Sequence, residues 1–260
     1  MMDEFSLIEF SGKFRDLRQL ERDYILVCLL NEIYLHFDNR LIFKGGTALK
    51  YFYNLNRFSE DLDFSYTDTN DVSLIISKIK KVFDNFNKQY PIIEIENRTR
   101  KEKGKVVGIN YILRIRGPLN NKLNHLQNIN IDISVRNDVI KKPELKYFSP
   151  IYSDIPVFSV PLMEIHEIMA EKVSAISERT KMRDIYDLYF LIFIKNISYN
   201  EKLTVEKMQK RELVFKREKI LEKLKNAENK MVWKSELSYL IDNLPDNLEV
   251  VSRLSKLFEK

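Results

Sequence analysis

The spacing of hydrophobic residues divides the chain into a first part of mixed character and a second part that is helical. Residues 3–37 carry hydrophobic side chains at helical intervals, for example at Leu17, Leu20, Tyr24 and Cys28. Such intervals place these side chains on one face of a helix. The pattern therefore predicts a helical N-terminal region.

Alternation of hydrophobic and polar residues dominates the middle of the chain. It is clearest between Ile129 and Ile133, where every second residue is isoleucine, and this period of two is typical of a strand with one buried face. Residues 72–86 have a helical pattern instead, with Asp71 as the expected N-cap. The predicted strands are 41–44, 61–66, 91–97, 106–116, 128–135 and 155–160, and residues 141–154 are predicted to form a loop.

The hydrophobic spacing becomes helical again after Val160, and Pro161 suits the first turn of a helix. We therefore predict an α+β fold, in which a mixed β-sheet flanked by helices in residues 1–160 is followed by a helical C-terminal domain in residues 161–260. The helices predicted in this second domain are 163–178, 184–194, 200–230, 233–242 and 248–258.

The composition excludes several classes of protein. The 260 residues are 44% hydrophobic, enough for one large or two modest domains. The net charge of +5 permits a polyanionic partner without requiring one. The single cysteine, Cys28, excludes an internal disulfide and a thiolate zinc site. The sequence has no secretory signal pattern and no run of about 18 apolar residues, so we expect a cytoplasmic protein.

A glycine pair lies between the first predicted strand and a short helical pattern. Gly45, Gly46 and Thr47 follow Phe43, and the helical pattern starts at Ala48. Glycine permits backbone conformations closed to other residues and lets main-chain N–H groups approach an anion at a helix N-terminus. The stretch is a candidate phosphate site, although a Gly-Gly pair before a helix is also typical of a simple turn.

Two acidic residues open the second predicted strand. Asp61 and Asp63 are separated by Leu62, so both carboxylates lie on one face of the strand, about 7 Å apart. Carboxylates at this spacing can hold one Mg²⁺ or bridge two ions. Asp132, in the middle of a later strand, is a candidate third ligand. Each of these acids alone also fits an exposed polar strand face.

A second group of charged residues occurs in the helical half. On an unbroken helix, Lys172, Arg179 and Arg183 would share one face. Asp184 would then lie about 120° away. If Lys172 and Asp184 serve one site, the helix has to break near residues 179–182, and Asp184 stands in the first turn of a second helix, where an acid is favoured. A pair of helices joined by surface salt bridges is the alternative.

Taken together, these segments resemble the AbiEii/AbiGii toxin family, which belongs to the DNA polymerase beta-like nucleotidyltransferase superfamily. The resemblance is carried by Gly45-Gly46-Thr47-Ala48-Leu49, by Arg57-Phe58-Ser59-Glu60-Asp61-Leu62-Asp63-Phe64 and by residues 167–191. It implies a nucleotidyltransferase-type sheet and a metal-dependent enzyme that moves NMP from an NTP to an acceptor hydroxyl, with Mg²⁺ or Mn²⁺ as cofactor.

The resemblance also implies roles for individual residues. Asp61 and Asp63 would be catalytic and hold metal, with Asp132 as a further metal ligand or as the base toward the incoming hydroxyl. Lys172 matches a family lysine that contacts nucleotide phosphates. Asp184 matches a further active-site aspartate, so the helical domain is expected to contribute Lys172 and Asp184 to the cleft.

The remaining motif residues have less definite roles. Arg57 either binds the triphosphate or braces its loop against Asp61. Arg183 and Asp187 match the family pattern too, and both a functional and a structural role are open for them. The residues predicted to bind the nucleotide are Gly45, Gly46, Thr47, Ser59 and Arg57.

The resemblance implies the toxin of a toxin–antitoxin or phage-defence (abortive infection) system, with a cognate antitoxin as partner. Related toxins modify the 3′ acceptor end of tRNA, so an RNA acceptor is predicted. Two other interpretations are an enzyme that nucleotidylates a protein and a nucleotide- or RNA-binding module without catalysis. The intact Asp61 and Asp63 pair argues against the last.

Overall fold

The computed structural model describes residues 2–67 and 72–259, and the expected helix cap Asp71 lies outside them. The chain forms two compact units. Two short segments from the first part of the sequence belong to the second, mainly helical unit. Unit 1 is Met1–Phe52, Glu60–Asn137 and Pro143–Leu162, and unit 2 is Tyr53–Ser59, Asp138–Lys142 and Met163–Lys260.

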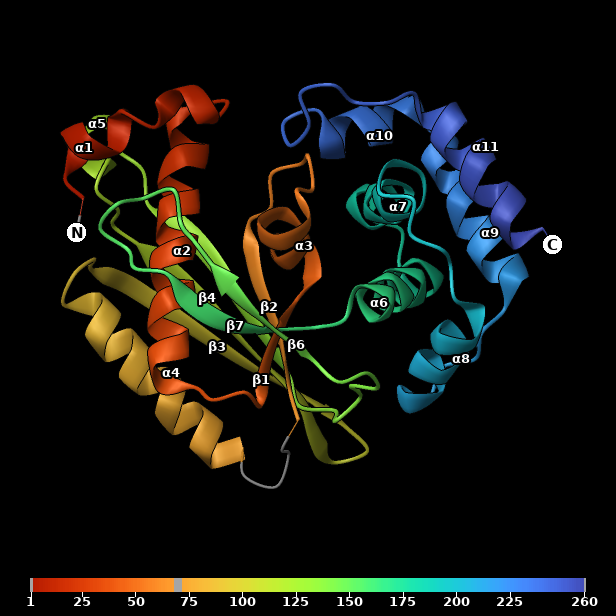
Figure 1. Cartoon of the computed structure of the whole chain (residues 1–260), viewed down its shortest axis with the longest axis horizontal. Helices are drawn as coiled ribbons and strands as arrows, with labels where there is room; N and C mark the ends of the chain where they lie inside the picture. Colours follow the sequence, from red (N-terminus) through yellow and green to blue (C-terminus); the bar gives the residue numbers. More distant parts are fainter. Residues whose placement is uncertain (1, 68–71, 260) are drawn as a thin grey trace. The chain divides into compact units, whose positions relative to one another are not determined.

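Unit 1 is built on one seven-stranded sheet (Figure 1). In chain order its strands are β1 (Leu41–Lys44), β2 (Asp61–Tyr66), β3 (Ile92–Glu102), β4 (Lys105–Ile115), β5 (Gln127–Ser134), β6 (Glu144–Phe148) and β7 (Phe158–Leu162). Across the sheet the order is β3-β4-β5-β2-β1-β7-β6. The pairs β2–β5 and β1–β7 are parallel and the other neighbours are antiparallel, so the sheet is mixed and the predicted α+β class is confirmed.

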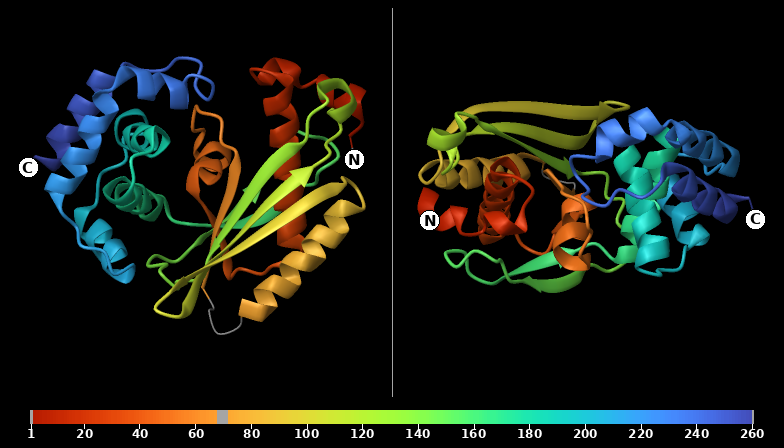
Figure 2. Two further views of the ribbon diagram at one scale, coloured as in Figure 1. Left: turned by 180° about the vertical axis from the view of Figure 1, so that it is seen from behind. Right: turned by 90° about the horizontal axis from the view of Figure 1, so that it is seen from above.

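Helices α2 (Leu17–His36) and α4 (Val72–Asn87) lie side by side along one face of this sheet (Figures 1 and 2). The alternate strand residues that point toward them are buried and apolar. Tyr34 of α2 packs edge-on against Phe64 of β2, and Phe83 of α4 packs edge-on against Tyr111 of β4. Burial of these large side chains contributes most to holding the helices on the sheet.

The polar residues of the same alternation belong to the opposite face. Asp61 and Asp63 on β2 and Asp132 on β5 are part of this face and are partly exposed. β3 forms one edge of the sheet, in a long hairpin with β4 (Figure 2), and is exposed along nearly its whole length. The acid pair Asp61 and Asp63 therefore lies on the polar face of the sheet.

Several predicted elements agree with the structure and others do not. The predicted strands 41–44 and 61–66 are confirmed. The predicted N-terminal region is helical but not continuous, because α1 (Glu4–Ile8) and a 3₁₀ turn at Ser11–Lys13 precede α2. The Asp16 side chain accepts the Gln19 N–H and starts α2 afresh.

The region before the helical unit was predicted least well. The predicted loop 141–154 is partly wrong, because β6 lies within it and pairs with β7 as an edge strand. The charged residues Glu144 and Lys146 in this stretch favoured the prediction of a loop. β7 starts three residues later than predicted and includes Pro161, so this proline is not the first turn of a helix. Instead, the Glu164 carboxylate accepts the His166 N–H and caps the helix.

Unit 2 contains most of the remaining helices. The prediction of one helix over residues 200–230 is wrong. The structure has two helices there, and Glu212 between them has a left-handed conformation. No helix in the described residues is long and apolar enough to span a membrane. The helices of unit 2 are α6 (Ile165–Glu178), α7 (Met182–Tyr189), a π-helical turn (Phe190–Ile194), α8 (Glu201–Lys210), α9 (Arg217–Lys225), a 3₁₀ turn (Asn226–Glu228), α10 (Lys230–Leu237) and α11 (Asn247–Phe258).

A buried carboxylate ties the segment Asp138–Lys142 to unit 2. Glu167 on α6 accepts the N–H groups of Ile140 and Lys141 at 2.9 and 2.8 Å. It also accepts a hydrogen bond from Lys207 on α8 at 2.8 Å. Glu167 and Lys207 are fully buried, so removal of either would leave an uncompensated charge inside unit 2.

Candidate active site

The glycine bend lies directly against the first acidic motif. β1 ends at Lys44, and α3 (Gly45–Tyr53) starts at Gly45 with a φ of +78°. A Cβ atom at this position would lie 2.9 Å from the Cβ and Cγ atoms of Asp63. Only glycine meets both requirements, because it has no side chain and adopts positive φ without strain. The start of α3 therefore adjoins the Asp63 carboxylate.

The sheet register brings the three predicted metal ligands onto one face. Asp61 and Asp63 are two residues apart on β2, and Asp63 is paired with Asp132 on the neighbouring strand β5. Residues paired across neighbouring strands are about 4.8 Å apart and point to the same face. The three acids thus form a row across two strands at the middle of the sheet.

Thr47 has a local structural contact. Its hydroxyl donates a hydrogen bond to the main-chain carbonyl of Asp61, and the residue is fully buried. This bond fastens the first turn of α3 to the start of β2. It thereby holds the glycine bend and the acid pair in register.

Asp132 has an ion-pair partner on the neighbouring hairpin. The Arg100 Nη2 atom on β3 lies 2.9 Å from its Oδ2 atom. This contact was not predicted from the sequence. The available signal was Gly108, an isolated glycine within a strand pattern, which often marks the close approach of another group.

The acid pair suits a hard cation. Asp61 and Asp63 offer carboxylate oxygens, and the missing side chain of Gly45 leaves room for the Asp63 carboxylate. Mg²⁺ is commonly held by one or two carboxylates, with substrate phosphates and water supplying its other ligands. Among residues 2–67 and 72–259, no three or more acidic, His or Cys side chains gather into a complete metal site. The residues therefore fit a metal that arrives with a triphosphate, and whether Asp132 joins them stays a prediction.

The second motif forms a buried ion cluster within unit 2. The Lys172 ammonium on α6 lies 3.0 Å from Asp184 Oδ1 and 2.6 Å from Asp187 Oδ2, both on α7. Arg57 binds Asp187 through two parallel hydrogen bonds of 2.6 and 2.8 Å. Arg179 pairs with Asp184 at 3.0 Å. Every member except Arg179 is buried.

The helix break explains how this cluster forms. α6 ends at Glu178, Arg179 is extended, and α7 starts at Met182. The break lies where the sequence predicted it for a shared site of Lys172 and Asp184. Asp184 stands in the first turn of α7, where the helix dipole favours an acid.

The charges in the cluster stabilise one another's ionised forms. Burial alone would raise the pKa of Asp184 and Asp187, but Lys172 and the arginines hold both pKa values below the ordinary range. Burial opposes the charge on Lys172 as well, yet the two carboxylates raise its pKa. All three groups are therefore ionised at neutral pH.

Two predicted phosphate-binding residues also belong to unit 2. Arg57 lies in the segment Tyr53–Ser59, and it also donates to the Phe58 carbonyl at 2.9 Å. Its side chain braces this segment through Asp187, where the sequence had suggested Asp61. Ser59 is buried at the end of the same segment. Phosphate binding by either residue stays a prediction.

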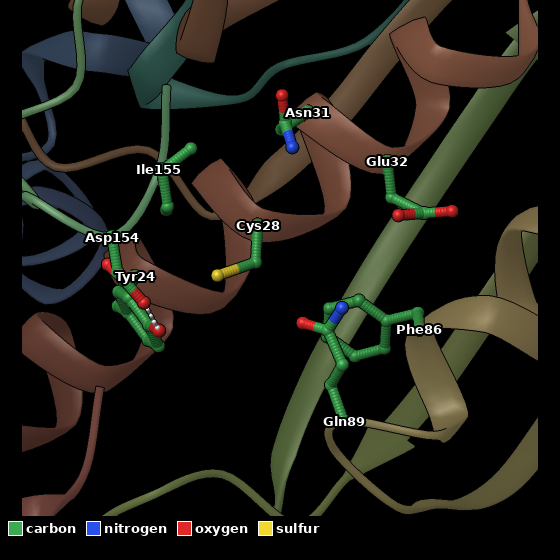
Figure 3. A pocket seen from close by; sticks show the side chains of 8 residues that line it. All are labelled: Tyr24, Cys28, Asn31, Glu32, Phe86, Gln89, Asp154 and Ile155. Carbon is green, nitrogen blue, oxygen red and sulfur yellow. Dashed lines mark hydrogen bonds between the residues drawn. The ribbon is translucent and has the colours of Figure 1, made fainter. Parts of the chain in front are cut away.

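A cavity of about 330 Å³ lies elsewhere in unit 1 (Figure 3). It is lined by residues of α2, by Phe86 of α4 and by Gln89, Asp154 and Ile155, none of which was predicted for the site. Tyr24 donates a hydrogen bond of 2.6 Å to Asp154. Burial raises the pKa of the Cys28 thiol to about 12, so the thiol is protonated and a poor nucleophile.

A comparison with known protein families identifies the family of the chain. Residues 29–259 match the family described as nucleotidyl transferase AbiEii toxin, type IV TA system. The chain belongs to this family of toxin–antitoxin nucleotidyltransferases, which confirms the predicted enzyme class.

Solved structures show the same fold at low sequence identity. MenT4, a nucleotidyltransferase toxin from Mycobacterium tuberculosis H37Rv, has a TM-score of 0.67 at 18% identity, over 99% of this chain and 89% of its own. JHP933 from Helicobacter pylori has a TM-score of 0.55 at 22% identity, over 94% of this chain and 91% of its own. No curated protein matched the chain in sequence.

Proposed function

We propose that this enzyme transfers NMP from a nucleoside triphosphate to a hydroxyl of an RNA, with the 3′ end of tRNA as the favoured acceptor. The contact between Gly45 and Asp63 is the observation that carries the proposal. It joins a helix N-terminus, which suits phosphate, to a carboxylate pair, which suits a divalent cation. A triphosphate with its bound metal requires both.

The roles of the unit 1 residues follow from this contact. Gly45, Gly46 and Thr47 would bind the phosphates through main-chain N–H groups, and the Thr47 hydroxyl would also hold the bend in place through its bond to Asp61. Asp61 and Asp63 would hold Mg²⁺ or Mn²⁺, which supplies charge neutralisation at the phosphates and lowers the pKa of the acceptor hydroxyl. Asp132 would join this pair or accept the hydroxyl proton.

The roles of the unit 2 residues are proposed from the family motif. Lys172 and Asp184 would be catalytic, and Ser59 and Arg57 would contact the nucleotide. In the structure the Lys172 ammonium is shared between two carboxylates. A phosphate contact by Lys172 would therefore have to compete with at least one of these partners.

A screen with labelled triphosphates tests the proposal. The protein is incubated with each α-³²P-labelled NTP, Mg²⁺ and total tRNA, and the products are separated by size. We expect label on RNA with the wild type and none with Asp61→Asn. Label on a protein instead would favour a protein-nucleotidylating enzyme. Nucleotide binding without transfer to any acceptor would favour a non-catalytic module.

The biological setting proposed is that of a cytoplasmic toxin acting in abortive infection and held in check by a cognate antitoxin. Family membership supports the toxin–antitoxin part of this proposal. Growth arrest on expression in bacteria, relieved by Asp61→Asn and by a protein encoded next to this chain, is the expected result. Unaffected growth would count against it.

A further inference from the structure

The Arg100 side chain extends across a neighbouring strand to the polar face that carries Asp132. It lies on β3 and contacts Asp132 on β5, and β4 runs between these strands. The guanidinium passes over Gly108, which is the residue paired with Arg100 in the β3–β4 ladder. The side chain therefore lies flat on the sheet.

Gly108 makes this crossing possible. A Cβ atom at this position would lie 2.7 Å from Arg100 Nε and 3.0 Å from its Cζ atom. Gly108 is absent from the glycines with positive φ in the described part of the chain. Its missing side chain, and not an unusual backbone conformation, is thus what this position requires.

The ion pair itself does little for the fold. The Arg100 side chain is 50% exposed and that of Asp132 is 21% exposed. Ion pairs this exposed contribute about 0–1 kcal/mol. Arg100 can therefore leave Asp132 for a stronger anionic partner at small cost, unlike the buried cations of unit 2.

The position of Arg100 relative to the acids indicates which substrate it would contact. The glycine bend follows β1, and Arg100 reaches the acids from β3 and β4, so the two approach β2 and β5 from opposite sides of the sheet order. In phosphoryl-type transfer the attacking and leaving oxygens lie in line on opposite sides of the phosphorus. If the triphosphate occupies the bend, the acceptor approaches from the side of Arg100.

We infer that Arg100, resting over Gly108, binds a backbone phosphate of the nucleic-acid acceptor and so guides the acceptor hydroxyl toward the acids. This inference rests on the proposed function. Guanidinium binds the oxygens of a phosphate through paired hydrogen bonds, and Arg100 is held at Asp132 by a partly exposed ion pair that costs little to break. On binding, Arg100 exchanges Asp132 for the phosphate, and Asp132 becomes available to the acceptor hydroxyl.

Two variants test the proposed phosphate contact of Arg100 in complementary ways. Arg100→Ala removes the charge, and Gly108→Val keeps the charge but displaces the side chain. Binding of 5′-fluorescein-labelled total tRNA is measured by anisotropy in EDTA, and KM for tRNA and kcat are measured with Mg²⁺. We expect each variant to raise Kd and KM about 5–10-fold and leave kcat within about twofold. For Arg100→Ala, Kd for tRNA should depend less steeply on salt concentration than in the wild type, by about one phosphate contact.

Arg114→Ala is the matched control. Arg114 lies on the same face of β4, about 20 Å along the strand from Gly108, and pairs with Glu94 at 2.9 Å with 51% of its side chain exposed. It should bind and react as the wild type does. Gly108→Val should add no further defect to Arg100→Ala, because both act through one side chain.

Other outcomes would overturn the inference and leave the proposed function intact. Wild-type transfer to tRNA with unchanged Kd and KM in both variants would exclude a phosphate contact. A fall in kcat alone would mean that Arg100 only positions Asp132. Transfer to protein that responds to Arg100→Ala would replace RNA by a protein acceptor. If the wild type transfers to no acceptor, the proposed function itself fails.

Discussion

Two pairs of aspartates illustrate two uses of acidic residues in this protein. Asp184 and Asp187 on α7 are buried and shared among Lys172, Arg57 and Arg179. Asp61 and Asp63 on β2 are partly exposed beside a glycine bend. The first pair forms ion pairs inside unit 2, whereas the second lies on the polar face of the sheet, where we propose a metal-bound triphosphate.

This difference separates the expected effects on stability and on activity. A buried ion pair that loses one member leaves an uncompensated charge, which is strongly destabilising. A partly exposed acid costs little to remove, but the loss of Asp61 or Asp63 would remove one of the two proposed metal ligands. Variants of the two pairs should therefore fail in different assays.

The largest effect is expected for Asp61→Asn. Without one of the two carboxylates the metal-bound triphosphate is poorly held, so NMP transfer should fall about 10²-fold or more. The melting temperature should shift by less than about 3 °C. Asp84→Asn, an exposed acid on α4, is the control and should retain activity. Full activity of Asp61→Asn would refute the assignment of β2 as the metal-binding strand.

Asp187→Ala should have the next largest effect, on folding. It leaves Arg57 and Lys172 buried without their shared partner, which should cost about 3–5 kcal/mol in the free energy of unfolding measured with urea. Glu94→Ala breaks the exposed pair with Arg114 and should cost less than about 1 kcal/mol. Equal losses in the two variants would contradict the contrast between buried and exposed charges.

A smaller effect is expected at the glycine bend. Gly45→Ala introduces strain at positive φ, worth about 1–2 kcal/mol, and pushes Asp63 out of place, so activity should fall about tenfold. Gly104 has the same φ of +78° but no atom within 4 Å of an added Cβ. Gly104→Ala should therefore show the strain without the loss of activity. An equal loss of activity in both variants would mean that contact with Asp63 is irrelevant.

The smallest effect concerns acid pH. The pKa values of Asp184 and Asp187 are lowered in the folded protein, chiefly by Lys172 and Arg57 against the effect of burial. Their stabilising contribution is therefore complete above their ordinary pKa of about 4 and is lost as the pH falls below it. The free energy of unfolding should decline below about pH 4, and less steeply in Asp184→Asn. An unchanged slope would show that Asp184 does not titrate with unfolding.

The sequence predicted the parts of the molecule that depend on local pattern. The strands bearing Phe43 and Asp61, and the helix break after Glu178, follow from alternation, from helical periodicity and from motif order. The edge strand β6 was missed because two of its hydrophobic residues, Leu145 and Tyr147, are 53% and 76% exposed. Phe148 at its end does pack against the aromatic rings of Tyr51 and Phe52, but the alternating pattern of a half-buried strand is weak in this stretch.

Contacts between distant residues could not be predicted in the same way. Arg57 and Asp187 are 130 residues apart in the sequence, and Arg100 and Asp132 are 32 apart. Each partner is an ordinary charged residue in its own surroundings, and the pairing arises from tertiary packing. The catalytic and nucleotide-binding assignments stay predictions until the variants described above are measured.

The two short segments that fold with the helical unit have a consequence for dissecting the protein. A fragment starting at Met163 would lack Arg57 and the N–H groups of Ile140 and Lys141, so Asp187 and Glu167 would lose partners that they have in the intact chain. Such a fragment should be insoluble or unfolded when expressed alone. The helical half is therefore not a transferable module, and hybrids between relatives need junctions that carry both segments along with it.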